Sequence, residues 1–126
     1  MRPEPIRSDK MPAALGPYSH AVRLGDLLFV SGQAGIDPAT GAPPTGSFDD
    51  EARQAFANLR AVLEAAGSGM EMVAKVTVFL ADAGLFPAMN GLFAEYFGVD
   101  PPARSTPIVA LPRGLRISIE AIAGFR

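Results

Sequence analysis

The 126-residue sequence contains no cysteine and no tryptophan, and His20 is its single histidine. Without cysteine the chain forms no disulfide and offers no thiol nucleophile. With one histidine it lacks the ligand sets of most zinc sites and the usual parts of a Ser-His triad. We therefore expect no metal site, and we assign any chemistry to carboxylates, arginine, tyrosine or backbone groups. His20 is expected to be a packed or interface residue.

The sequence also lacks a dominant charge and a long apolar run. Eleven basic residues face 13 acidic ones, for a net charge of −2, so no electropositive surface is expected to hold nucleic acid. No run approaches the roughly 18 apolar residues of a membrane span, and the N-terminus has no signal-peptide core. Neither G-x-G-x-x-G nor a P-loop occurs. These absences predict a cytoplasmic protein with no nucleic acid, membrane or nucleotide partner.

What is present predicts one domain over residues 1–126, because 48% hydrophobic content at this length supports a single core. Residues 1–17 are rich in proline and are expected to form an extended surface lead-in. Two β-prone runs, 18–23 and 27–32, are separated by Gly25-Asp26, which predicts a hairpin. Residues 37–46 hold three prolines and two glycines and predict an irregular loop.

Two helices and three more strands complete the predicted chain. Ser47 with Asp50 three residues later predicts a helix start, apolar residues recur at helical spacing up to Ala66, and Gly67 closes the helix. Residues 72–80 are apolar on both faces and predict a central strand. A second helix is expected from about 83 to 97, followed by strands at about 104–111 and 115–125.

The resulting order, β-β-α-β-α-β-β, predicts an α+β fold with two helices on one face of a mixed sheet. On the last strand Ile117, Ile119 and Ala121 should face the helices. The opposite face should carry Arg116, Ser118, Glu120 and Ile122. Tyr18 and the face of residues 73, 77 and 79 should add apolar surface there. Such a patch would be large on a monomer, so we expect a symmetric oligomer with a pocket at its interface.

Few residues are candidates for chemistry. Glu120 lies within the apolar stretch 117–123, where a carboxylate is unusual without a partner or a task. Arg104 follows Pro-Pro-Ala at a predicted strand start, where its guanidinium can bind a carboxylate in bidentate fashion. Ser31 and Gly32 end an apolar strand and can present backbone N–H groups to a ligand. A solvated edge-strand glutamate, a surface arginine and a plain turn remain the alternatives.

Several short motifs recur in the order and spacing of one known family, and the sequence resembles the RidA/YjgF family over nearly its whole length. The motifs are Gly16-Pro17-Tyr18-Ser19, Phe29-Val30-Ser31-Gly32-Gln33, Asn58-Leu59, Lys75-Val76-Thr77-Val78-Phe79, Pro102-Ala103-Arg104-Ser105 and Ile119-Glu120-Ala121-Ile122-Ala123. The resemblance implies a chorismate-mutase-like α+β fold. It also implies a homotrimer whose sheets form a central barrel, with three clefts between subunits and no cofactor.

The resemblance further implies the roles of the site residues. Arg104 would bind the substrate carboxylate, and Glu120 would position the attacking water. Tyr18, Ser31, Gly32 and Asn90 would line the cleft, some of them from the neighbouring subunit. Thr106 stands where the family often has cysteine, and it would supply a hydroxyl or backbone contact. Two further departures are Pro107-Ile108, which replaces a more usual apolar-polar pair, and a stretch from Arg104 to Glu120 about one residue shorter than in the deaminases.

The implied reaction is hydrolysis of enamine or imine intermediates, 2-iminopropanoate or 2-iminobutanoate, to 2-oxo acids and ammonia, a form of metabolite damage control. A non-catalytic trimer that binds small carboxylates or acts as a chaperone is the alternative, because Arg104 alone suffices for binding. Ribonuclease activity occurs in some family members. The slightly acidic chain, without a basic and aromatic strand surface, does not favour it here.

Overall fold

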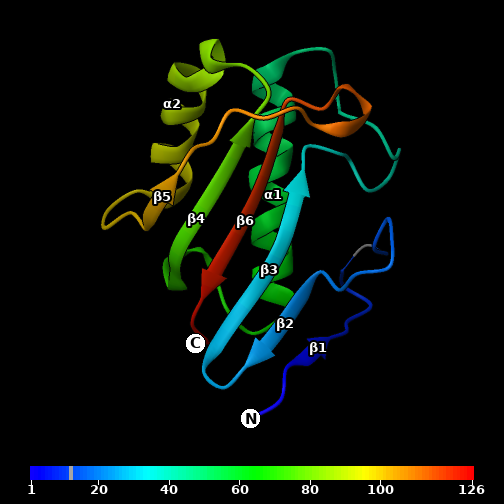
Figure 1. Cartoon of the computed structure of the whole chain (residues 1–126), viewed down its shortest axis with the longest axis vertical. Coiled ribbons are helices and arrows are strands. Elements are labelled where there is room, and N and C mark those ends of the chain that lie inside the picture. The colour runs from blue at the N-terminus through cyan, green and yellow to red at the C-terminus, as the bar shows by residue number, and fades with distance from the viewer. Residues whose placement is uncertain (12) are drawn as a thin grey trace.

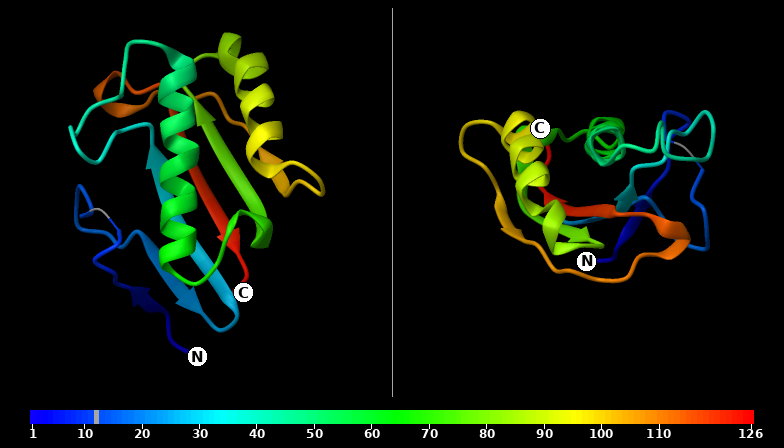
Figure 2. Two further views of the ribbon diagram at one scale, coloured as in Figure 1. Left: turned by 180° about the vertical axis from the view of Figure 1, so that it is seen from behind. Right: turned by 90° about the horizontal axis from the view of Figure 1, so that it is seen from above.

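One six-stranded sheet carries both α-helices on a single face (Figures 1 and 2). The computed structural model describes residues 1–11 and 13–126, so Pro12 of the predicted lead-in lies outside the described residues. The strand order is β1-β2-β3-β6-β4-β5. The β4–β5 pair is parallel and the other neighbours are antiparallel. The predicted α+β class, mixed sheet and one-sided helices are therefore confirmed.

The predicted hairpin is present and has an additional strand beside it. Strand β2 (Ala21–Leu24) pairs with β3 (Leu27–Ala34), and Gly25 in the turn has a φ of 60°, which glycine adopts without steric cost. Strand β1 (Glu4–Ile6) lies within the lead-in and pairs with β2. The sequence prediction missed this strand because Pro5 discourages a strand assignment, whereas proline is tolerated at a sheet edge.

Helix α1 begins as the sequence indicates and both helices end near the predicted glycines, whereas α2 begins about three residues later than predicted. Helix α1 (Phe48–Ala65) is capped by Ser47, whose Oγ accepts a hydrogen bond of 3.0 Å from the backbone N–H of Asp50. Gly67 follows it with a φ of 86°. Helix α2 (Phe86–Phe97) follows a 3-10 turn (Ala83–Leu85), carries Pro87 in its first turn and ends at Gly98. Apolar side chains of both helices form the core with the sheet.

The two helices also contact each other directly. The ring of Phe56 on α1 stacks on that of Tyr96 on α2, with centroids 4.9 Å apart. Arg53 on α1 forms an ion pair with Asp49 of the same helix at 2.8 Å and a second one with Glu95 of α2 at 3.0 Å. Hydrogen bonds to Asp49 and then to Glu95 raise the pKa of Arg53 above its ordinary value. Because these groups are exposed, we attribute the helix packing to the apolar contact.

Strands β4 (Val73–Leu80) and β6 (Ile117–Ala123) form the centre of the sheet. Ile117, Ile119 and Ala121 are buried beneath the helices, and Glu120 lies exposed on the opposite face, as predicted. Val73 was predicted on the Glu120 face and is instead buried on the helix side. The pairing with β6 shifts between Val73 and Lys75, and a one-residue irregularity reverses the face of every residue before it.

The strand after the second helix is shorter than predicted. Strand β5 (Ala103–Ser105) has three residues, and beyond it only a single bridge joins Ile108 to Leu80. Pro107 has no N–H to donate to a ladder, and a 3-10 turn (Pro112–Gly114) precedes β6, so the predicted strand to residue 111 does not form. No described helix is long and apolar enough to cross a membrane.

Arg116 was predicted on the Glu120 face, and this prediction is wrong. It lies just before β6, and its side chain turns to the first turn of α1, where Glu51 is 2% exposed. The backbone N–H of Arg116 donates to Glu51 Oε2 at 2.7 Å, and its Nε donates to Oε1 at 2.9 Å. Two hydrogen bonds to a buried carboxylate therefore override the alternation expected from the strand pattern.

Replacing Glu51 with glutamine should lower the free energy of unfolding by about 2 kcal/mol, because it removes a buried charge from two charge-assisted hydrogen bonds. Urea denaturation measures this change. Glu64→Gln, on the exposed side of the same helix, is the control and should have little effect. Equal stability of the two variants would show that the Glu51 to Arg116 contact contributes nothing to the fold.

Candidate functional site

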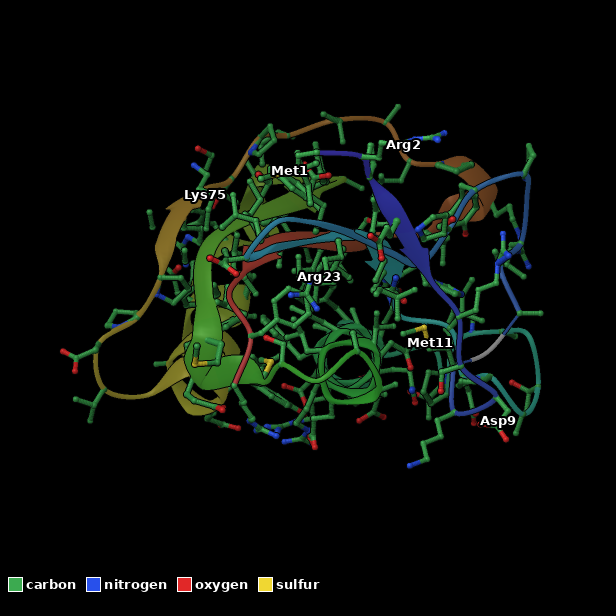
Figure 3. The ribbon with its side chains drawn as sticks, turned by 90° about the horizontal axis from the view of Figure 1, so that it is seen from below. Met1, Arg2, Asp9, Met11, Arg23 and Lys75 are labelled. Atoms are coloured by element: carbon green, nitrogen blue, oxygen red, sulfur yellow. The ribbon has the colours of Figure 1, made fainter. Side chains whose placement is uncertain are left out.

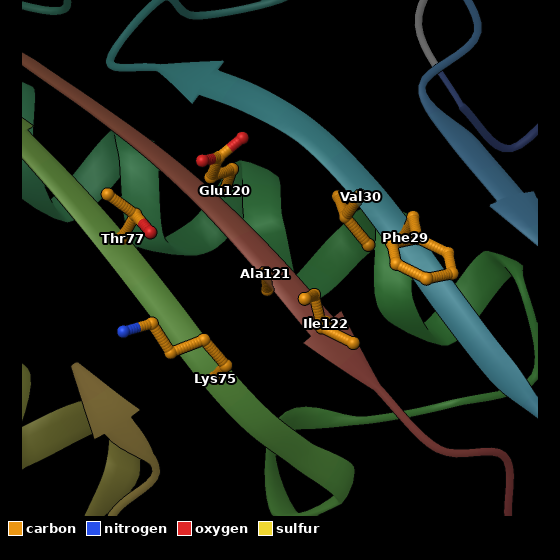
Figure 4. A pocket seen from close by; sticks show the side chains of 7 residues that line it. All are labelled: Phe29, Val30, Lys75, Thr77, Glu120, Ala121 and Ile122. Carbon is orange, nitrogen blue, oxygen red and sulfur yellow. The ribbon is translucent and has the colours of Figure 1, made fainter. Parts of the chain in front are cut away.

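Glu120 projects from β6 into a shallow cavity of about 160 Å³ on the open face of the sheet (Figure 4). The walls of this cavity are Phe29, Val30, Lys75, Thr77, Ala121 and Ile122. Thr77 on β4 lies directly opposite Glu120. The open face therefore places the Glu120 carboxylate among apolar side chains, the hydroxyl of Thr77 and the ammonium of Lys75, from three adjacent strands.

A bulge in β3 lies on the other side of Glu120. Val30 pairs with Ala121 and Gln33 pairs with Ile119, so Ser31 and Gly32 together face the single residue Glu120. A Cβ on Gly32 would lie 2.7 Å from Ser118 Oγ, so only glycine fits without a shift there. The hydroxyl of Ser31 donates to the carbonyl of Ser19 at 2.6 Å. Ser31 thus anchors the chain before the hairpin, and Gly32 allows a close approach to the backbone.

Tyr18 and Gly32 line a second cavity, of about 290 Å³, beside the bulge. Tyr18 is 46% exposed, and its ring meets that of His20 edge-on at 5.9 Å. Nε2 of His20 is buried and has no hydrogen-bond partner among the described residues. The structure therefore places Ser31 and Gly32 beside Glu120, and Tyr18 beside Gly32 in the second cavity.

Two polar residues of this region received no site role in the sequence analysis. Gln33 is 5% exposed, and its amide donates to the carbonyl of Ser31 at 3.0 Å. Asn58 on α1 donates to the carbonyls of Ala34 at 3.0 Å and Ile36 at 2.8 Å. Asn58 could have been recognised from the sequence, because it is a polar residue inside the apolar stripe of a predicted helix. Both residues hold the backbone around the bulge.

Arg104 lies at the opposite edge of the sheet, on the helix side. Its partner on β4 is Val76, which is buried under the helices. The guanidinium carbon lies 4.7 Å from the ring centroid of Phe93 and 5.4 Å from that of Phe86, and Nη1 contacts the sulfur of Met89 at 3.8 Å. No carboxylate among the described residues is within 4.0 Å of it. The half-buried cation therefore lacks an acidic partner within the described chain.

Asn90 and Thr106 are the other two residues expected in the cleft. Asn90 lies on α2, the helix that Arg104 contacts, and Thr106 lies two positions after Arg104 in the sequence. Asn90 follows Met89 on α2, and Thr106 follows β5; both are half-buried. Lys75, which Figure 3 labels on β4, also connects this strand to the edge, since its Nζ donates to Ser105 Oγ at 2.9 Å. The described residues contain no cluster of His, Cys, Asp or Glu suited to a metal ion.

The expected site residues thus form two groups that one chain does not bring together. Val76 and Thr77 are consecutive on β4 and point to opposite faces. Arg104 pairs with Val76, and Glu120 pairs with Thr77. The carboxylate lies on the open face and the guanidinium on the helix side. The expectation of a cleft between subunits remains a prediction, and it is compatible with this separation.

Comparison with known proteins identifies the family. A family model described as Endoribonuclease L-PSP matches residues 8–125. A protein named RutC family protein from Pyrococcus horikoshii is 46% identical over 121 residues, 95% of this chain and 96% of that protein. The 2-iminobutanoate/2-iminopropanoate deaminase of Mus musculus is 45% identical over 119 residues, 94% of this chain and 88% of that protein.

A solved structure shows the same fold. The crystal structure of RidA from the Antarctic bacterium Psychrobacter matches with a TM-score of 0.90 at 39% identity, covering 97% of this chain and 99% of that one. The chain belongs to the RidA/YjgF family, as the motifs indicated.

Proposed function

We propose that this protein is a hydrolase that converts 2-imino acids such as 2-iminopropanoate and 2-iminobutanoate to 2-oxo acids and ammonia. The observation that carries the proposal is the half-buried guanidinium of Arg104, which has no acidic partner among the described residues. A substrate carboxylate would supply that partner. The deaminase name of relatives at about 45% identity supports the same chemistry.

The site would lie between two copies of the chain, in a homotrimer whose sheets form a central barrel. The open face carries Phe29 at 37% and Leu27 at 46% exposure, next to half-buried Ile122, and such a face favours burial against another copy. Arg104 of one copy would meet Glu120, Tyr18 and Gly32 of the next. We place this activity in the cytoplasm.

The proposed mechanism uses side chains and water only. Arg104 binds the substrate carboxylate through two parallel hydrogen bonds and orients the imine. Glu120, as a carboxylate, accepts a proton from a water molecule as the oxygen bonds to the iminium carbon. Protonated Glu120 returns its proton to the carbinolamine nitrogen, ammonia leaves, and the hydroxyl proton passes to the Glu120 carboxylate as the carbonyl of the 2-oxo acid forms. Asn90 and Thr106 would contact the substrate from the Arg104 side.

The test generates 2-iminobutanoate from threonine with a dehydratase and traps it with semicarbazide. The protein should divert the imine to 2-oxobutanoate and lower semicarbazone formation. Mixing then tests the shared cleft: Arg104→Ala and Glu120→Gln chains, each impaired alone, should regain activity when refolded together, since about a quarter of the clefts in randomly mixed trimers would carry both native residues. If wild-type protein does not lower semicarbazone formation, the proposed activity is wrong. If the mixed chains are no more active than the single variants, the shared cleft is wrong.

A further inference from the structure

The guanidinium of Arg104 is held by side chains of α2, the helix nearest to the β5 edge of the sheet (Figure 1). Its carbon lies over the rings of Phe93 and Phe86, and its Nη1 contacts the sulfur of Met89. Positions 86, 89 and 93 follow each other at spacings of three and four, which places them on one face of the helix. We call these three residues the α2 cradle.

The contacts with the cradle use almost none of the hydrogen-bonding capacity of Arg104. A guanidinium carries N–H donors on every nitrogen, and a thioether sulfur is a weak acceptor. Among the described residues, the Arg104 side chain donates only to the sulfur of Met89, at 3.8 Å. An aromatic ring attracts a cation through the charge distribution of its face and offers no oxygen acceptor. The remaining N–H groups are therefore available to an anion.

Three other arginines are held in a different way. Arg53, Arg116 and Arg126 each donate to a carboxylate at 3.0 Å or less. A carboxylate of the chain fixes a guanidinium firmly, but it also occupies the N–H groups that would bind a substrate carboxylate. The cradle fixes Arg104 by apolar and cation–π contacts instead, so the protein supplies no competitor for the substrate there.

We propose that Phe93, Phe86 and Met89 are positioning residues that hold the guanidinium of Arg104 in place with its N–H groups free. This inference rests on the proposed function and names residues that act on the substrate through Arg104. An arginine side chain is long, and a substrate that binds it must otherwise restrict its rotamers. Because the cradle restricts them beforehand, losing part of it should weaken binding of a carboxylate.

The first experiment removes one ring of the cradle. Phe93→Leu should weaken the binding of 2-oxobutanoate, measured by calorimetry, about fivefold or more, which is the effect expected from loss of a cation–π contact. Phe93→Tyr keeps the ring face and should retain the wild-type affinity. Tyr96→Leu is the control, because Tyr96 is another ring of α2 that carries an arginine, Arg60 at 5.4 Å, without contacting Arg104. It should leave the affinity unchanged.

A double variant separates positioning of Arg104 from a general effect on the fold. The measured quantity is the rate at which 2-iminobutanoate is removed. Arg104→Ala and Arg104→Ala/Phe93→Leu should be equally slow, because no guanidinium is left to position. If Phe93→Leu lowers the rate by the same factor with and without Arg104, its effect is independent of that residue and the inference is overturned.

A third pair of variants tests whether the cradle must lack an acceptor. Phe86 is 38% exposed, so a polar side chain is tolerated at this position. Phe86→Glu and Phe86→Gln both remove the ring, but only glutamate offers Arg104 a competing carboxylate. The affinity for 2-oxobutanoate should therefore be about tenfold lower in Phe86→Glu than in Phe86→Gln. Equal affinities of the two variants would contradict the inference.

Failure of the inference and failure of the proposed function give different results. If the wild type neither binds 2-oxobutanoate nor removes the imine, the proposed function is wrong and the inference fails with it. If the wild type does both, but Phe93→Leu binds as tightly as the wild type or no more weakly than Tyr96→Leu, the function stands and the cradle has only a structural role. Selective loss in Phe93→Leu, with recovery in Phe93→Tyr, supports the inference.

Discussion

Replacing Arg104 with alanine should lower the rate at which the protein removes 2-iminobutanoate by about 10- to 100-fold, because the substrate would lose its only charge-assisted anchor. Imino acids of this size offer few other contacts, so the carboxylate bonds dominate both binding and orientation. The measurement is the loss of semicarbazone as a function of protein concentration.

The Arg104 prediction has two controls. Arg60→Ala removes another guanidinium that lies over an aromatic ring, 5.4 Å from the centroid of Tyr96, and it should leave activity unchanged. Arg104→Lys keeps the charge without the planar fork and should recover only part of the rate. Thermal unfolding and size-exclusion chromatography check that loss of the contacts to Met89 and Phe93 has not disrupted the fold or the oligomer. Unchanged turnover in a folded Arg104→Ala protein rejects the role of Arg104.

Replacing Glu120 with glutamine should lower turnover by about 10²- to 10⁴-fold, the usual contribution of a general base. The amide keeps the size of the side chain but does not accept a proton from water. Because Glu120 is exposed on the open face and forms no ion pair with the described residues, the substitution should leave the fold intact. The comparison is with Glu64→Gln on the exposed side of α1, which should retain full activity.

The Glu120 variant also separates an enzyme from a binding protein. Affinity for a non-reacting 2-oxo acid, measured by calorimetry, should be retained in Glu120→Gln and lost in Arg104→Ala, because Arg104 alone holds the carboxylate. If the wild-type protein binds the 2-oxo acid but Glu120→Gln hydrolyses imines as fast as the wild type does, Glu120 is not the base. If neither protein hydrolyses the imine faster than it decays without protein, the wild type matches the alternative of a non-catalytic trimer that binds small carboxylates.

Local features of the fold were predictable from neighbouring residues. The Ser47 cap, the Gly25-Asp26 turn and the terminal Gly67 and Gly98 act within a few positions along the chain, and the structure confirms each of them. The alternation of Ile117, Ile119 and Ala121 with Glu120 needs only the two-residue period of a strand, so the face of Glu120 was correct as well.

The errors arise where distant segments meet. The irregularity that moves Val73 to the helix side depends on its pairing with β6, and Arg116 turns to Glu51, 65 residues away in the sequence. Strand β1 forms because β2 has a free edge to pair with. Propensity and periodicity contain no information about which strands become neighbours, so the positions of these residues do not follow from the sequence pattern.

By itself the sequence determined the residue types available for chemistry, the ends of the helices, the hairpin and the face of Glu120, because each depends on composition or short-range geometry. Only the tertiary structure decided that Arg104 and Glu120 lie on opposite sides of β4, that the β3 bulge faces Glu120, and that a recess opens beside Gly32. These arrangements follow from strand order and register, which long-range packing selects and a one-residue shift reverses.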